Sequence, residues 1–180
     1  MYISIVVAKR MKASSNYSNQ RVGVFVDVQN LYHSSKNLYK ARVNYQELMK
    51  ALIGDRELIR SMAYVVKSDT ATGEAAFFEA LEKAGMELRS KDLQIYADGL
   101  KKADWDVGMA VDAIRMSSFL DVVVLVTGDG DFLPLVDYLK WGVGRLVEVA
   151  AFKRSCSSKL QEAADVFINL EEVPKVILKK

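Results

Sequence analysis

Two aspartates, Asp129 and Asp131, follow directly on an apolar run in the stretch VVVLVTGDGDFLPL at residues 122–135. A third, Asp27, stands at the end of another apolar run, RVGVFV. Carboxylates brought together repel one another, and an oxygen-ligated divalent cation removes that repulsion. Such a cation can activate water and polarise a phosphoryl oxygen. These residues therefore indicate metal-assisted hydrolysis at phosphorus.

The other metal-binding side chains of the sequence are scarce. The single cysteine, Cys156, and the single histidine, His33, cannot supply a zinc site of nitrogen and sulfur ligands. The lone cysteine also excludes an internal disulfide framework. A catalytic metal would have to be held mainly by oxygen, which favours Mg²⁺ or Mn²⁺.

Composition describes a globular chain of 180 residues, 51% hydrophobic and 27% charged. The net charge of +2 gives no global basicity for nucleic acid, although Lys101–Lys102 and Lys153–Arg154 are local candidates. No apolar stretch approaches the roughly 20 residues that span a bilayer. The start, MYISIVVAKRMK, places apolar before basic residues, the reverse of a signal peptide. We predict a cytoplasmic protein without membrane association.

The chain divides into one domain with short ends. Residues 13–20, ASSNYSNQ, are polar and aperiodic, so residues 1–20 are interpreted as an N-terminal extension. No linker or repeat divides residues 21–172, and residues 173–180 form a C-terminal tail.

Hydrophobic patterns predict alternating strands and helices. Predicted strands cover residues 22–26, 58–66, 86–95, 122–127, 144–152 and 167–170, with 86–95 polar enough for an edge. Predicted helices start near Asn30 or Leu31, at Asn44 as N-cap, near Gly73, at Asp104 as N-cap, at Phe132, and at Ser158 with Gln161 in capping-box spacing.

One helix has a distinctive apolar stripe. Val107, Ala110, Val111 and Ile114 fall at i, i+3, i+4 and i+7. This spacing predicts an amphipathic helix.

Alternation of this kind predicts an α/β fold, a three-layer Rossmann-like sandwich around a mostly parallel sheet of about five or six strands. Sites in such sheets form outside the carboxyl ends of the strands. If the strands ending at Asp27 and Thr127 are neighbours, Asp27, Asp129 and Asp131 converge. Asp106, in the first turn of the preceding helix, points over the same rim. Asp112 lies about 120° away from it and ranks second.

Each residue also has a structural explanation. Asp131 could cap a helix, Asp129 could serve a glycine-rich turn, Asn30 could cap the first helix, and Asp106 could complement a helix dipole. Four acids at one rim are harder to explain as independent caps. Trp105, Tyr32 and Phe132 could stack bases, but core packing is the simpler role for at least two of them.

Four blocks together resemble the NYN domain, in the LabA-like bacterial branch of the PIN-like nuclease superfamily. They are VFVDVQNLY (24–32), KKADWDVGMAVDAI (101–114), VVVLVTGDGDFLPLV (122–136) and AFKRSCSSKLQEAADVFINL (151–170). The resemblance implies a Rossmann-like sheet, an acidic pocket dependent on Mg²⁺ or Mn²⁺, and an RNA substrate. The matching positions are Asp27, Asn30, Asp106, Asp112, Asp129 and Asp131.

Two positions depart from the family pattern. Many NYN sequences carry glycine and serine where this chain has Val28 and Thr127. Thr127 keeps the hydroxyl, while Val28 affects only how closely a ligand approaches the backbone.

The leading hypothesis is a metal-dependent ribonuclease. Asp27, Asp106, Asp129 and Asp131 would hold the metal, Asn30 would position water or phosphate, and Thr127 would support the loop. Phosphate contacts would come from Lys101, Lys102, Lys153, Arg154 and Lys159.

The alternative hypothesis is a non-catalytic module that binds RNA or protein. The sequence is also compatible with a homodimer. Phosphatase chemistry of the haloacid dehalogenase type would need an acid where Gln29 stands. A TOPRIM-like domain would need a glutamate in place of Asp27. A receiver domain would need a phospho-acceptor aspartate at the end of its third strand, and this sequence offers no clear one there.

Overall fold

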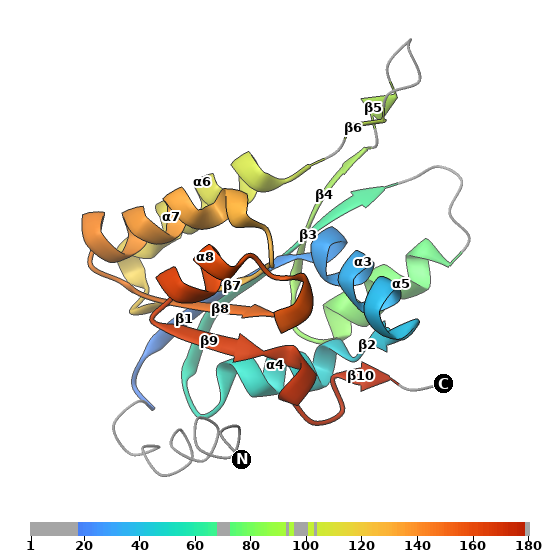
Figure 1. Ribbon diagram of the computed structural model, residues 1–180, viewed down its shortest axis with the longest axis horizontal. Helices are drawn as coiled ribbons and strands as arrows, with labels where there is room; N and C mark the ends of the chain where they lie inside the picture. Colours follow the sequence, from blue (N-terminus) through green and yellow to red (C-terminus); the bar gives the residue numbers. More distant parts are fainter. Residues whose placement is uncertain (1–17, 68–72, 93, 96–100, 103, 179–180) are drawn as a thin grey trace.

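The computed structural model describes residues 18–67, 73–92, 94–95, 101–102 and 104–178. A central sheet of six parallel strands has helices on both faces (Figure 1). Its order is β4-β3-β1-β7-β8-β9. The predicted α/β fold is confirmed.

The main elements of the described chain are the strands of the central sheet and the α-helices that cover it. The sheet strands are β1 (Arg21–Asp27), β3 (Glu57–Lys67), β4 (Glu87–Asp92), β7 (Val122–Val126), β8 (Leu146–Ala151) and β9 (Val166–Asn169). The α-helices are α3 (Val28–Tyr39), α4 (Tyr45–Ile53), α5 (Glu74–Lys83), α6 (Asp106–Met116), α7 (Leu133–Asp137) and α8 (Ser158–Ala163).

Short segments complete the described chain. The 3₁₀ turns are η1 (Ser117–Phe119), η2 (Gly130–Phe132), η4 (Lys153–Ser155) and η5 (Leu170–Glu172), and η3 (Tyr138–Gly142) is π-helical. Two antiparallel pairs lie outside the main sheet, β2 (Arg42–Val43) with β10 (Ile177–Leu178) and β5 (Gln94–Ile95) with β6 (Lys101–Lys102).

The central strands are buried because both faces of the sheet are covered. All five residues of β7 are buried, which explains its continuous rather than alternating apolarity. On one face, Val24 packs in a core with Leu48 of α4. On the other, Phe25 packs in a second core with Met109 of α6.

Several helix starts follow from side-chain caps. Asn44 accepts a hydrogen bond from the Glu47 backbone N–H at 3.3 Å, as its position predicted. The first helix begins at Val28, earlier than predicted, because the Asp27 carboxylate caps it. Two predicted caps were wrong. Trp105 rather than Asp104 precedes α6, and Ser157 rather than Ser158 precedes α8.

The predicted capping box in α8 is replaced by contacts of another kind. The Gln161 side chain donates to the backbone oxygens of Lys153 and Cys156, at 3.3 and 3.0 Å. These contacts hold the loop between β8 and α8 against the helix.

The predicted strand at 86–95 is shorter than expected. Its first part is β4, which lies at the edge of the sheet as its polarity predicted. Gln94 and Ile95 instead pair with β6.

The stripe predicted for α6 faces outward. Val107, Val111 and Ile114 are exposed, while Met109 and Ala113 are buried in the core. Asp112 is buried beside them. The predicted helix is present, and its predicted apolar stripe lies on the side turned away from the sheet.

Within the described part of the chain, no helix combines the length and apolarity needed to cross a membrane.

Candidate metal centre

The candidate site lies where the strand order of the sheet changes direction. Strands β3 and β4 lie on one side of β1. Strands β7, β8 and β9 lie on its other side. The carboxyl ends of β1 and β7 are therefore at a topological switch point, where open α/β sheets form their sites. Asp27 ends β1, and the loop Thr127–Asp131 follows β7.

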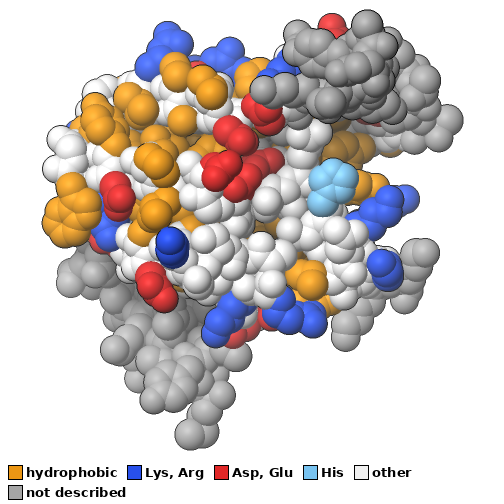
Figure 2. All heavy atoms as spheres, turned by 45° about the horizontal axis from the view of Figure 1, so that its top comes forward, with side chains coloured by type: hydrophobic (Ala, Val, Ile, Leu, Met, Phe, Trp, Pro, Cys, Tyr) orange, Lys and Arg blue, Asp and Glu red, His pale blue; other side chains and the backbone are white. Residues whose placement is uncertain are grey.

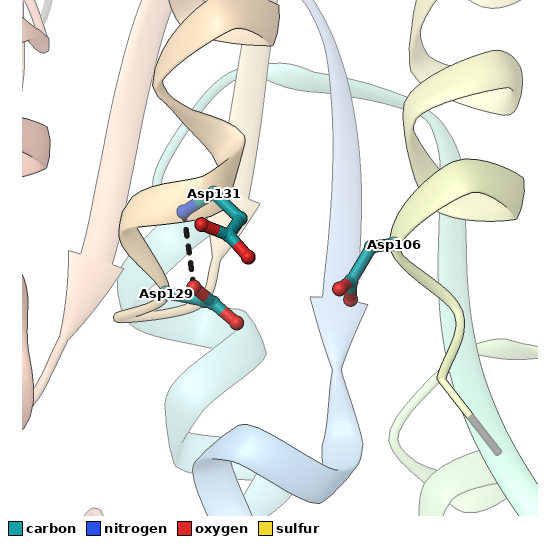
Figure 3. A group of neighbouring side chains, drawn as sticks. All are labelled: Asp106, Asp129 and Asp131. Atoms are coloured by element: carbon teal, nitrogen blue, oxygen red, sulfur yellow. Dashed lines mark hydrogen bonds between the residues drawn. The ribbon is translucent and has the colours of Figure 1, made fainter. Parts of the chain in front are cut away.

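Three carboxylates meet at this edge. Asp106, Asp129 and Asp131 each offer an oxygen, and these oxygens all lie within 4.8 Å of one another. Their side chains face one another across the end of β1 (Figure 3). The Asp131 backbone N–H donates to Asp129 Oδ1 at 3.0 Å, which fixes the shape of the loop. Of the four acids predicted at this rim, Asp106, Asp129 and Asp131 thus form the close group, and Asp27 is not part of it.

Asp27 is held beside this group by hydrogen bonds to both oxygens. Its Oδ1 accepts from the Asn30 backbone N–H at 3.1 Å, and its Oδ2 accepts from the Thr127 hydroxyl at 3.1 Å. Thr127 Oγ1 in turn accepts from the Asp129 backbone N–H at 3.2 Å. The buried Thr127 hydroxyl therefore links Asp27 to the backbone of Asp129.

The Asn30 side chain fixes the loop from the side of α3. Its Oδ1 accepts from the Gly128 backbone N–H at 2.9 Å. Asn30 thus has a positioning contact in this structure. Its role toward water or phosphate stays a prediction.

Burial and mutual repulsion disfavour the charged carboxylates. Burial raises the pKa of Asp27, and the charge of Asp129 adds to this effect, while the hydrogen bonds from Asn30 and Thr127 oppose it. Burial also raises the pKa of Asp106. The surrounding carboxylates raise the Asp106 pKa further, in the order Asp27, Asp129, Asp104 and Asp131.

The donor set fits a hard divalent cation. The group consists of carboxylate oxygens that repel one another, the arrangement a bound cation stabilises. Oxygen ligands suit Mg²⁺, Mn²⁺ or Ca²⁺ better than softer metals. The described residues offer no histidine or cysteine within this group.

The loop after β8 supports the loop after β7. The Ser157 backbone N–H donates to the Gly128 oxygen at 2.9 Å. A Cβ on Gly128 would lie 3.0 Å from the Ser155 oxygen and 3.1 Å from Cys156 Cα. A side chain at this position would require the neighbouring backbone to shift by a few tenths of an ångström. The sequence reasoning missed this support, and the only available signal was the run of small residues Ser155–Ser158 after β8.

We expect Gly128→Ala to lower the free energy of unfolding by about 1–3 kcal/mol, because the added methyl meets backbone that cannot turn aside. Gly130→Ala is the matched control. A Cβ there would lie 3.0 Å from Ser157 Oγ and 3.2 Å from Ser157 Cβ, which are side-chain rather than backbone atoms. Urea unfolding of both variants measures the difference. Equal costs would show that the Ser155–Cys156 backbone yields easily.

Asp112 lies apart from the three-carboxylate group. Its Oδ2 accepts from the Tyr64 hydroxyl at 3.0 Å, and the Arg89 guanidinium contacts the same oxygen at 3.4 Å. These contacts join α6 to β3 and β4. The lower rank given to Asp112 agrees with this placement.

The predicted phosphate-binding residues lie in three segments, β6, η4 and α8. Lys153 and Lys159 are exposed in η4 and α8. Arg154 pairs with Glu171 at 3.1 Å, and its guanidinium lies 5.1 Å from the Tyr39 ring centroid. Lys101 and Lys102 form β6, but their side chains lie outside the described structure.

The aromatic residues near the acids divide as predicted. Phe132 is buried, and Trp105 packs against the core with its indole N–H donating to the Val65 oxygen at 2.8 Å. Tyr32 is exposed and contacts His33 edge to face, with ring centroids 5.5 Å apart.

His33 is a residue whose position sequence reasoning did not use. Burial raises the pKa of Asp27, and an electrostatic interaction with His33 opposes this effect, which places His33 within electrostatic reach of the site. Acidic side chains gather near the centre of the face shown in Figure 2, and His33 lies on the same face. Its spacing of three from Asn30 on α3 was the available signal.

Comparisons with known proteins agree with this architecture. The low amplitude and bright protein LabA of Synechococcus elongatus is 23% identical over 170 residues, covering 88% of this chain and 88% of LabA. A crystal structure of a protein of unknown function from Vibrio parahaemolyticus matches with a TM-score of 0.82 and 30% identity, covering 89% of this chain and 98% of that one. A model of the NYN domain matches residues 21–171. The chain therefore belongs to the NYN domain family, as a LabA-like member.

Proposed function

We propose that this protein is a metal-dependent ribonuclease that hydrolyses RNA phosphodiester bonds at the carboxyl edge of its sheet. The observation that carries the proposal is the meeting of Asp106, Asp129 and Asp131, with oxygens within 4.8 Å, at the switch point between β1 and β7. Membership of a family within the PIN-like nuclease superfamily supports RNA as the substrate.

Asp106, Asp129 and Asp131 would hold Mg²⁺ or Mn²⁺, with Asp27 beside them. The cation would supply charge for the phosphoryl oxygens and lower the pKa of the attacking water. Thr127 and Asn30 keep the carboxylates in place through the hydrogen bonds described above. Asp27, whose raised pKa makes it a stronger base than an ordinary aspartate, is suited to accept the proton of the attacking water.

Substrate contacts in this proposal come from the residues around the edge. Lys153 and Lys159 would contact phosphates without reading bases, as would Lys101 and Lys102. Arg154 contributes less because it already pairs with Glu171. The low net charge of +2 predicts modest affinity for RNA. The metal centre, rather than tight binding, would then determine whether bound RNA is cleaved.

The test is cleavage of labelled single-stranded and structured RNAs in Mg²⁺, Mn²⁺ or EDTA. Asp129→Asn should leave cleavage at background, whereas Asp137→Asn, an exposed aspartate of α7 outside the group, should retain it. A Mn²⁺-induced rise in melting temperature, absent in Asp129→Asn, provides a readout independent of substrate. Cleavage that survives Asp129→Asn would exclude this site. RNA bound but not cut by the metal-loaded protein would favour the non-catalytic module.

A further inference from the structure

The outer side of α6 carries a row of exposed apolar side chains. Val107, Val111 and Ile114 are 75%, 44% and 38% exposed. Their spacing of four and then three residues places them on one stripe of the helix. The inner side packs Met109 and Ala113 into the core. The sheet therefore covers only one of the two apolar sides of α6.

Further exposed apolar side chains lie in η1 and η3. Phe119 is exposed in η1, and Tyr138 and Trp141 are exposed in η3, with Trp141 at 81%. Segments α6 and η3 cover the same face of the sheet, because Met109 and Leu139 belong to one core cluster. Figure 2 shows hydrophobic side chains gathered beside the acidic ones. Large exposed apolar patches of this kind mark interaction sites.

The chemistry of the stripe favours a protein partner over RNA. RNA-binding surfaces use aromatic faces for bases and cations for phosphates. Valine and isoleucine provide neither. Three branched aliphatic side chains on one helix are instead the usual material of helix-to-helix packing.

The charges of α6 favour a second copy of the same chain. The helix has Arg115 in its last turn, and the exposed Asp104 stands just before its start. An antiparallel pair related by a two-fold axis brings each Arg115 to the acidic start of the opposite helix. The same axis places the Val107 of each copy near the opposite Ile114.

We propose that α6 is the contact of a symmetric homodimer, packed antiparallel against the α6 of a second copy about an axis near Val111. Asp106 lies about 140° from Val111 around the helix and faces Asp129 (Figure 3), so the dimer contact and the acidic group use different sides of α6. The dimer does not rest on the ribonuclease proposal, and either can fail alone.

Sedimentation velocity and light scattering of the full chain test the dimer. Wild type should show about twice the 20.1 kDa chain mass. Val111→Asp should halve that mass. Leu178→Asp is the matched control, because Leu178 is 45% exposed but packs with β2 on the other face of the sheet. Circular dichroism confirms that each variant folds.

Cross-linking tests the two-fold arrangement. Facing residues of helices packed about 8–10 Å apart come close enough for a disulfide. In a Cys156→Ser background, Val111→Cys should form a covalent dimer on mild oxidation, and Leu178→Cys should not. Burial raises the pKa of the native Cys156 thiol to about 11, so this thiol is poorly reactive. Its replacement by serine therefore removes little cross-linking capacity from the protein.

Three outcomes overturn the proposal. The first is wild type that stays monomeric at every concentration, and the second is a dimer that survives Val111→Asp. The third is a dimer without the Val111→Cys cross-link, which excludes the antiparallel contact. A monomeric wild type whose RNA affinity falls in Val111→Asp would assign the stripe to RNA instead.

Discussion

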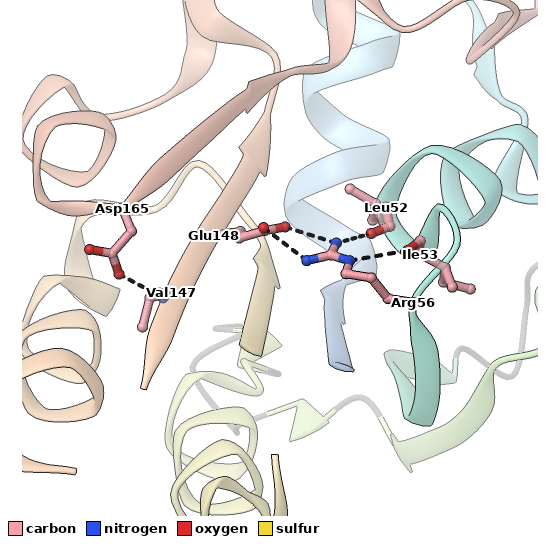
Figure 4. Close-up of polar contacts among 6 residues, drawn as sticks. All are labelled: Leu52, Ile53, Arg56, Val147, Glu148 and Asp165. Atoms are coloured by element: carbon pink, nitrogen blue, oxygen red, sulfur yellow. Dashed lines mark hydrogen bonds and ion pairs between the residues drawn. The ribbon is translucent and has the colours of Figure 1, made fainter. Parts of the chain in front are cut away.

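Arg56→Ala should lower the free energy of unfolding by about 3–5 kcal/mol, because it leaves a buried carboxylate without its guanidinium. The Arg56 and Glu148 side chains are only 9% and 7% exposed. Arg56 Nη1 and Nη2 donate to the two Glu148 carboxylate oxygens at 3.0 and 3.1 Å (Figure 4). The same guanidinium donates to the backbone oxygens of Leu52 and Ile53 at the end of α4. One side chain therefore ties α4 to β8.

Arg60→Ala is the matched control for this pair. Arg60 bonds Glu87 at 3.0 Å, but these side chains are 44% and 52% exposed. Exposed pairs contribute at most about 1 kcal/mol. Urea unfolding with equal m-values compares the two variants. If Arg56→Ala costs no more than Arg60→Ala, water reaches the Glu148 carboxylate and the pair is not an internal one.

A double replacement separates the net value of the pair from the cost of breaking it. Arg56→Met with Glu148→Leu removes both charges and keeps much of the apolar volume. Its cost should be well below that of Arg56→Ala, since no buried charge is left behind. A double variant as unstable as Arg56→Ala would attribute the loss to the backbone bonds at Leu52 and Ile53.

Asp106→Asn should change stability in opposite directions with and without metal. In EDTA at neutral pH, it should raise the free energy of unfolding by about 0.5–2 kcal/mol, because it removes one of the mutually repelling charges. With Mn²⁺ at a hundredfold excess over Kd, wild type should gain about 2.7 kcal/mol. The variant should lose most of that gain, because it lacks one ligand. Thermal unfolding under both conditions gives the two numbers.

The gain of Asp106→Asn in EDTA should depend on pH. The folded-state pKa of Asp106 is raised above its unfolded value. The charged carboxylate therefore costs stability in full above the folded pKa, and this cost disappears as pH falls to the unfolded value of about 4. The gain should be largest at neutral pH and shrink in acid. A variant less stable than wild type in EDTA would contradict repulsion at this site.

Metal-induced stabilisation of wild type should also weaken in acid. Protons compete with the cation for carboxylates, and the raised pKa values of Asp27 and Asp106 move that competition to higher pH than for ordinary aspartates. Asp137→Asn should follow wild type at every pH, because Asp137 is outside the three-carboxylate group. A Mn²⁺ effect that persists unchanged in acid would indicate binding elsewhere.

The sequence predicted the site better than it predicted one of the helices that hold it. Continuous apolar runs ending in Asp27 and Thr127 indicated parallel strands, and strand ends share one edge of a sheet. Both facts are local, but the convergence of the acids also required the two strands to be neighbours, which the local pattern does not determine. The pairing of β1 with β7 then brought the acids together.

The face of α6 could not be predicted in this way, because the helix has two apolar stripes. Val107, Val111 and Ile114 form one, and Met109, Ala113 and Met116 form the other. The second contains Asp112, which sequence rules place in solvent. The carboxylate is buried because the Tyr64 hydroxyl and Arg89 bond it. Tyr64 and Arg89 lie 48 and 23 positions from Asp112 in the sequence, so the local hydrophobic periodicity does not indicate these contacts.

The place of β1 at the middle of the sheet has a consequence for synthesis of the chain. Its Asp27 and the Thr127 that bonds it are 100 residues apart. At roughly 5–20 residues per second, a ribosome needs about 5–20 s to make that interval. During this time β1 can pair with β3 but leaves its other edge open. Until β7 has been made, the open edge of β1 in the nascent chain must not pair with other strands. The mutually repelling carboxylates first come together at that late step.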